Sequence, residues 1–170
     1  MAEPFTIYKL TILNMLNKID FPLTNTQISN FFLERDYTGY FSIQQALSDL
    51  LDAKMIDFKT TRANTRYWIT DAGRETLNIF RDKLTDAIDD DLDSYFKANQ
   101  MKIKKDNSLL ADYKASSRGY VVRCQLRSDN RTMLDLKLNV RKEEQAEAIC
   151  NNWKKQNEDV YAYLMDILLK

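Results

Sequence analysis

The chain has 170 residues, of which 44% are hydrophobic, enough for one medium-sized domain or two small ones. Its 25 Lys and Arg residues balance its 25 Asp and Glu residues, which speaks against a protein that coats nucleic acid through bulk positive charge. There is no histidine, so the usual general base, the commonest metal ligand and the Ser-His and Cys-His nucleophile pairs are all excluded.

The first residues have neither the basic nor the long apolar region of a signal peptide, and no apolar run reaches the roughly 20 residues that span a bilayer. We therefore expect a soluble, cytoplasmic protein with no membrane partner. Cys124 and Cys150 lie among apolar residues without metal-binding spacing, which favours buried, reduced thiols over the alternative of a disulfide.

The chain opens with two predicted helices. Apolar residues at helical spacing predict the first over residues 5–19, ending before Pro22. Thr24 and Gln27 then form a Thr-x-x-Gln capping box, which predicts the start of a second helix. That helix is expected to end near Arg35, where a turn follows.

A third helix is predicted to start at a second capping box, formed by Ser42 and Gln45. One of its faces is apolar and the other is polar. Asp49 and Asp52 on the polar face would repel phosphates, so we expect them to lie away from a duplex. Near the amino-terminal end, three side chains are of the kind that reads base edges, although a solvated face is the alternative interpretation: Gln44, Gln45 and Ser48.

A β-hairpin is predicted next, with one strand through Phe58 and a second over residues 66–69. Between the strands, the stretch KTTRANTR has three positive charges and no negative one. Such a tip suits contact with phosphates, and a merely solubilising turn is the alternative. The predicted DNA-binding residues of helix and hairpin are Gln44, Gln45, Ser48, Lys59, Thr60, Thr61, Arg62 and Arg66.

Thr70 is expected to cap a fourth helix, with Asp71 at its positive end. The predicted order of elements is that of a winged helix-turn-helix: two helices, a third helix with a polar front, a two-stranded ribbon and a further helix. The short segment between ribbon and fourth helix would therefore close the wing.

The stretch ALSDLLDAKMIDFKTTRANTRYWITDAGRETL resembles the corresponding part of PadR-like and MarR-like bacterial transcriptional regulators. Those families show a leucine pair in the recognition helix, an isoleucine, a basic wing and a Tyr-x-Leu/Ile-Thr-x-x-Gly-x-x-x-Leu pattern. The matching residues are Leu47, Leu50, Ile56, Arg62, Arg66, Tyr67, Ile69, Thr70, Gly73 and Leu77. Over its whole length the chain also resembles a bacterial family that joins a winged helix to a small α+β domain and is described as a domain of unknown function. The resemblance implies DNA binding by the third helix and the wing.

The second half begins with apolar residues at spacings of three and four from Leu77 to Phe96, which predict one long helix or two joined near Thr85. Within it, DAIDDDLD contains five aspartates. We favour a solvated helix face over a calcium loop, because the glycine and terminal glutamate of such a loop are missing.

Residues 109–140 alternate between apolar and polar and predict a three-stranded antiparallel meander, with turns at residues 117–119 and 128–130. The last thirty residues are predicted to cover it as helix, with a possible break near Asn157. Trp153, Tyr161 and Tyr163 favour core or dimer-interface packing over a ligand pocket.

We therefore predict an α+β protein with a winged helix-turn-helix over residues 1–84. Residues 85–170 would hold a connecting helix, the meander and its covering helices.

The leading functional prediction is a sequence-specific regulator of transcription that binds double-stranded DNA as a homodimer, with the third helix in the major groove and the wing on the backbone. The alternative is a protein–protein interaction adaptor that uses the winged helix and the sheet as docking surfaces. An enzyme, a cofactor and a bound metal are not expected, since the sequence has no phosphate-binding glycine loop, no nucleophile–base pair and no metal-ligand set. The sequence leaves open whether a small-molecule effector exists.

Overall fold

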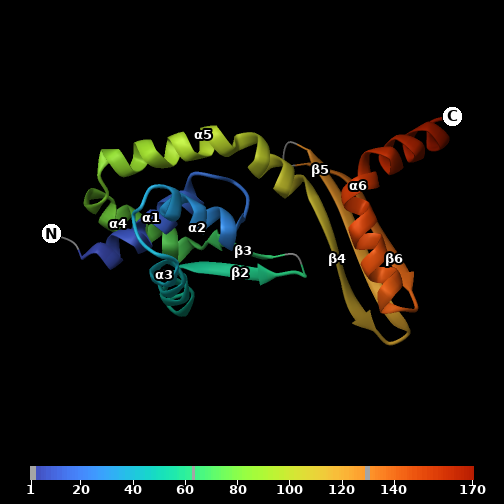
Figure 1. Cartoon of the computed structure of the whole chain (residues 1–170), viewed down its shortest axis with the longest axis horizontal. Helices are drawn as coiled ribbons and strands as arrows, with labels where there is room; N and C mark the ends of the chain where they lie inside the picture. The colour runs from blue at the N-terminus through green and yellow to red at the C-terminus, as the bar shows by residue number, and fades with distance from the viewer. Residues whose placement is uncertain (1–2, 63, 129–130) are drawn as a thin grey trace. The chain divides into compact units, whose positions relative to one another are not determined.

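A computed structural model describes residues 3–62, 64–128 and 131–170 of the chain. The protein combines helices with two three-stranded antiparallel sheets, which confirms the α+β class (Figure 1). It divides into two compact units, residues 1–100 and residues 101–170. The division therefore falls sixteen residues later than the predicted boundary between residues 84 and 85.

The first unit packs helices around a small sheet of order β1-β3-β2. Its core is formed by fully buried side chains such as Ile12, Phe31, Ile43 and Leu77. Its elements are α1 (Pro4–Asn17), β1 (Leu23–Thr24), α2 (Asn25–Glu34), α3 (Tyr40–Asp52), β2 (Ile56–Thr60), β3 (Thr65–Ile69), α4 (Asp71–Phe80) and a 3-10 turn, η1 (Arg81–Lys83), after which α5 (Asp86–Ser108) runs on past the boundary.

The helix starts were predicted with mixed success. The capping box before α2 is confirmed, because the Gln27 N–H donates to Thr24 Oγ1 at 3.1 Å and the Thr24 N–H donates to Gln27 Oε1 at 2.9 Å. The second capping box is wrong. The N-cap of α3 is Gly39, three residues before Ser42, and the helix begins at Tyr40 with no side-chain cap, since nothing in the preceding sequence stops the helix from extending back to Tyr40.

The start of α4 depends on both Thr70 and Gly73. Thr70 caps the helix, as predicted, by accepting the Gly73 N–H at 3.2 Å, and its own hydroxyl donates to the Lys54 carbonyl at 2.7 Å. The Thr70 N–H donates to the Met55 carbonyl at 3.0 Å. A Cβ at Gly73 would lie 2.1 Å from that same carbonyl oxygen, so only glycine lets α4 come this close to Met55.

Of the two arrangements that the sequence left open after Leu77, one long helix or two, the structure has two. Helix α4 ends at Phe80 and α5 begins at Asp86, directly after Thr85. Thr85 caps α5, since its Oγ1 accepts the Ile88 N–H at 3.3 Å. Because DAIDDDLD is helical, the calcium-loop alternative is wrong. The favoured alternative, a solvated face, holds for Asp86 and Asp90, which are exposed.

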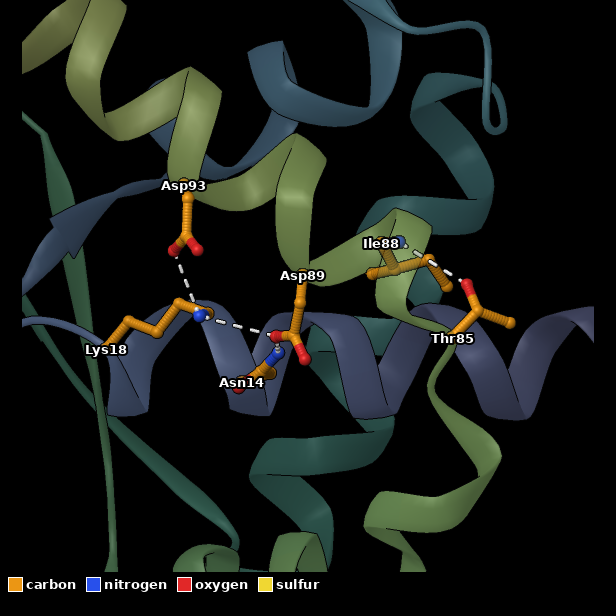
Figure 2. Close-up of polar contacts among 6 residues, drawn as sticks. All are labelled: Asn14, Lys18, Thr85, Ile88, Asp89 and Asp93. Atoms are coloured by element: carbon orange, nitrogen blue, oxygen red, sulfur yellow. Dashed lines mark hydrogen bonds and ion pairs between the residues drawn. The ribbon is translucent and has the colours of Figure 1, made fainter.

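Other aspartates of α5 instead contact α1 and the residue that follows it (Figure 2). The buried Asn14 of α1 donates from Nδ2 to Asp89 Oδ1 at 2.6 Å. Lys18 Nζ lies 3.3 Å from Asp89 Oδ1 and 3.0 Å from Asp93 Oδ1, so one ammonium bridges two successive turns of α5. This cluster, with the hydrogen bond between Tyr37 and Asp91, holds the beginning of α5 against the other helices of the first unit, which is why this part of α5 belongs to that unit.

The α1–α5 cluster makes stability depend on pH. The hydrogen bond from Asn14 and the charge of Lys18 hold the pKa of Asp89 below its ordinary value of 3.8. A carboxylate with a lowered pKa in the folded state adds stability above its unfolded pKa, and this contribution is lost as the pH falls through the folded value. The contribution is moderate, because the Asp89 side chain is 36% exposed.

We expect Asp89→Asn to lower the free energy of unfolding by about 1 kcal/mol at pH 7, and the difference from wild type to shrink as the pH falls below 3.8. Urea denaturation at a series of pH values measures it. Asp90→Asn is the matched control, since Asp90 is the exposed neighbour, and its stability should follow wild type throughout. An Asp89→Asn effect that stayed constant down to pH 2.5 would contradict the electrostatic explanation.

The second unit confirms the predicted meander, with β4, β5 and β6 in that order. Residues 129 and 130, part of the second predicted turn, lie outside the described residues. One core unites sheet and helix through Val122, Cys124, Ala146, Cys150 and Trp153. The elements are β4 (Leu109–Ser116), β5 (Gly119–Ser128), β6 (Arg131–Val140) and α6 (Glu143–Leu168).

The break predicted near Asn157 is absent from α6, which is one helix that changes direction along its length (Figure 1). Asn157 is buried and its Nδ2 donates to the Trp153 carbonyl at 2.9 Å, a bond that competes with the helix ladder. The three aromatics predicted as a packing stripe separate: Trp153 is core and donates to the Gln125 carbonyl, whereas Tyr163 is exposed.

Both cysteines are buried with free thiols, as favoured from the sequence. Burial raises the pKa of the Cys124 thiol to about 11, which keeps it protonated and unreactive at neutral pH.

Candidate nucleic-acid interface

The β2–β3 hairpin brings the predicted basic residues to one face. Lys59 lies directly opposite Arg66 in the antiparallel register, and Asp57 lies opposite Trp68 on the same face. Tyr67 and Ile69 point the other way and are buried, so the predicted alternation is confirmed. The outward face of the ribbon therefore carries two adjacent cationic side chains, an exposed aromatic ring and the carboxylate of Asp57.

The two threonines predicted to contact DNA serve to close the hairpin. Thr60 Oγ1 lies 3.1 Å from Thr65 Oγ1 across the two strands. The Thr61 N–H and hydroxyl both point to the Asn64 carbonyl, at 2.9 and 3.3 Å. Residue 63 lies outside the described residues. Thr60 and Thr61 thus hold the shape of the tip, while the neighbouring Arg62 is exposed.

The charge of the hairpin is one-sided only toward its tip, because the exposed Asp57 lies at the base of β2 on the same face as Lys59 and Arg66. Between Phe58 and Thr70 the sequence has three cationic side chains and no carboxylate. Lys59 and Arg66 face each other across the ribbon, so their two positive charges lie close together. A phosphate placed over this face would be attracted by both of them.

Helix α3 exposes only part of its predicted reading face. Gln45 and Ser48 are exposed, whereas Gln44 is half-buried. The Gln44 amide exchanges two hydrogen bonds with Asn25 of α2, at 2.8 and 2.9 Å, and also donates to Ser29 at 3.3 Å. Gln44 was predicted to read bases, but its amide is occupied in joining α3 to α2, which the sequence did not indicate because Asn25 lies nineteen residues earlier.

The carboxylate of Asp49 is balanced by its neighbours. Gln45 Nε2 donates to Asp49 Oδ1 at 2.9 Å, and Lys9 Nζ of α1 lies 3.2 Å from Asp49 Oδ2. The hydrogen bond from Gln45, followed by Lys9, lowers the pKa of Asp49. The repulsion that Asp49 was expected to exert on phosphates is therefore partly offset by a cation from another helix.

Two aromatic residues of α3 were missed from the sequence. Tyr40 is 53% exposed and Phe41 is 87% exposed, with their ring centroids 6.2 Å apart in an edge-on arrangement. The signal was available, because Phe41, Gln45 and Ser48 follow the i, i+4, i+7 spacing of one helix face. It was overlooked because α3 was expected to begin at Ser42, which left Phe41 outside the helix.

Other kinds of site find little support in the part of the chain that the structure describes. Within residues 3–62, 64–128 and 131–170, no group of three or more Cys, Asp or Glu side chains is placed to hold a metal ion. None of the described helices combines the length and the apolar character that crossing a membrane requires.

One known protein family matches almost the whole chain. Residues 8–168 match the family described as Domain of unknown function (DUF4364), and the chain belongs to that family. This agrees with the expectation, from the sequence, of a family described as a domain of unknown function. No curated protein and no solved structure matches the chain.

Proposed function

We propose that this protein is a sequence-specific binder of double-stranded DNA that regulates transcription as a homodimer, and that its first unit is a winged helix-turn-helix. The order α1-β1-α2-α3-β2-β3-α4, with β1 paired to β3, supports this reading of the unit. In such a domain the third helix enters the major groove and the hairpin serves as the wing.

The observation that carries the proposal is the charge of the hairpin in a chain of zero net charge. Lys59 and Arg66 share one face of the ribbon and Arg62 is exposed at its tip. These three side chains would bind phosphates, which fixes the register of the protein on the duplex. Gln45 and Ser48 of α3 would then read base edges.

Three of the residues predicted to bind DNA take another role in this proposal. Gln44 holds α3 against α2 through Asn25, and Thr60 and Thr61 shape the hairpin. They would position the contacting side chains without touching DNA themselves. This leaves a small footprint of three cations in each copy, so two copies on one site are needed for useful affinity.

The carboxy-terminal end of α6 supports a dimer. Beyond Val160 the chain exposes apolar side chains on more than one side. A helix at the surface of a protein normally buries its apolar side chains against the core and exposes its polar ones. A second copy of the same segment would cover the exposed apolar side chains in a two-fold interface. The exposed residues are Tyr163, Met165, Ile167, Leu168 and Leu169.

Selection of genomic duplex fragments on the purified protein tests the function. We expect enrichment of one motif whose two halves are related by two-fold symmetry, with half-site centres about one helical turn, roughly 10 base pairs, or a multiple of it apart. Enrichment of a single, non-repeated half-site would contradict the homodimer but not the recognition of DNA. The absence of any enriched sequence, from protein shown to be folded, would contradict DNA recognition.

A protein–protein adaptor is the second candidate, and the exposed apolar end of α6 is the observation that favours it. In that case charge changes in the hairpin would leave a partner complex largely intact, since the partner would be held through apolar contacts. Affinity capture with wild-type protein and with hairpin variants separates this candidate from the regulator.

A further inference from the structure

We propose that Phe41 makes this protein prefer a thymine at one position of each half-site, by contact with the thymine C5-methyl group. The inference rests on the proposed DNA binding and names the residue that would give it part of its sequence preference. It starts from a side chain that neither the capping nor the packing of the fold explains.

Phe41 is far more exposed than the apolar side chains of α3 that face the core. The apolar side chains Ile43, Leu47 and Leu50 are almost fully buried, whereas the ring of Phe41 is 87% exposed. Keeping a phenylalanine ring in water forgoes about 1.5–3 kcal/mol of burial energy. An exposed ring at the start of the helix that would enter the major groove is explained if an apolar group of the DNA covers it in the complex.

The position of Phe41 suits contact with bases. Phe41, Gln45 and Ser48 lie on one face of α3, and seven residues of helix rise about 10 Å, close to three base-pair steps. Phe41 stands at the amino-terminal end of this row, the end of a recognition helix that reaches base edges. Each of the three side chains can therefore face a different base pair.

Chemistry selects thymine among the four bases. In the major groove, guanine, cytosine and adenine present only hydrogen-bonding groups, to which a phenyl ring offers no partner, and thymine alone adds a methyl group. Tyr40 packs edge-on against Phe41, with a ring-plane angle of 75°, which limits the freedom that the ring would lose on binding. The first turn of α3 carries no acidic side chain that would repel the adjacent phosphates.

Replacing single thymines of the selected fragment by uracil tests the inference, because uracil lacks only the C5-methyl group. For wild type, we expect one position per half-site at which uracil weakens binding about fourfold, and about fifteenfold when both half-sites are changed. With Phe41→Ala this penalty should disappear, while binding to the uracil fragment should match that of wild type. Since Phe41 is exposed, the variant is expected to fold, and its melting curve checks this.

Ile79→Ala is the matched control, as Ile79 is a 70% exposed apolar residue on α4, and it should keep the full uracil penalty. The inference is overturned if no position is sensitive to uracil, or if Phe41→Ala keeps the penalty. In both cases salt-dependent binding to the fragment would persist, so the proposed function would stand. If no duplex is bound at all, both proposals fall, and loss of a captured protein partner on Phe41→Ala would assign the ring to a protein interface.

Discussion

Reversing the charge of Lys59 and Arg62 together is expected to weaken binding to the selected duplex at least a hundredfold at physiological salt. Both side chains are exposed on the hairpin, and no acidic residue lies between Phe58 and Thr70. The double variant Lys59→Glu/Arg62→Glu would remove two phosphate contacts from each copy and add repulsion in their place. Fluorescence anisotropy with a labelled fragment measures the dissociation constant.

The choice of residues and control makes that result specific. Arg66 is left intact because it is half-buried in the central strand β3, where substitution would disturb the sheet. Lys154→Glu/Lys155→Glu, on an exposed part of α6, changes the net charge by the same amount. We expect the control to lose less than fivefold, the part due to overall charge. Equal losses in both variants would mean that the hairpin has no specific role.

Gly73→Ala is expected to lower the free energy of unfolding by about 3 kcal/mol, the largest effect on stability that we foresee for so small a change. The added Cβ would lie 2.1 Å from the Met55 carbonyl oxygen and 2.8 Å from a side-chain carbon of Ile69. The backbone at Met55 cannot yield easily, because its carbonyl also accepts the Thr70 N–H. Helix α4 would have to move away from β3, with loss of the cap.

Gly39→Ala serves as the control for the stability measurement. No atom lies within 4 Å of a Cβ built at Gly39, and its backbone, with φ −87° and ψ 168°, is one that alanine adopts freely. Only the poorer capping ability of alanine acts there, so the loss should stay below about 1 kcal/mol. Urea denaturation of the three proteins gives the comparison. A loss at Gly73 no larger than at Gly39 would show that the close contact between α4 and Met55 does not limit stability.

Local signals predicted those parts of the first unit in which neighbouring residues hold each other. Thr24 and Gln27 are three residues apart and each accepts a hydrogen bond from the backbone of the other, so the start of α2 could be predicted from the sequence. The start of α4 could likewise be predicted, from Thr70 and Gly73. The second hairpin strand could be predicted because Tyr67 and Ile69 alternate with Arg66 and Trp68, as a two-sided ribbon requires.

Contacts between distant residues were beyond such reasoning. Asn14 meets Asp89 across 75 positions of sequence, and Lys18 reaches the same carboxylate, which turns part of an aspartate-rich face toward α1. Gln44 looked like a base reader, and only its contact with Asn25 reveals a role in packing. Side-chain type indicates what a residue is able to bind, whereas the fold decides which partner it meets.

The candidate interface was likewise only partly predictable. The positive charge of the hairpin is a property of sequence, and it needed no structure. The exposure of Phe41 depends on where α3 begins, and with the N-cap placed at Ser42, three residues too late, the ring had no assigned face. An error of this size at a helix end is enough to hide a contact residue, because successive residues point about 100° apart.

The salt dependence of wild-type binding to the selected duplex tests the central claim, that the hairpin binds the DNA backbone, most directly. Three phosphate contacts in each of two copies predict a slope of about −5 for the logarithm of the association constant against the logarithm of the salt concentration. Lys59→Glu/Arg62→Glu, with one contact left per copy, should reduce the slope to about −2. A wild-type slope near zero, with binding retained, would contradict phosphate contact by the hairpin and with it the proposed mode of DNA recognition.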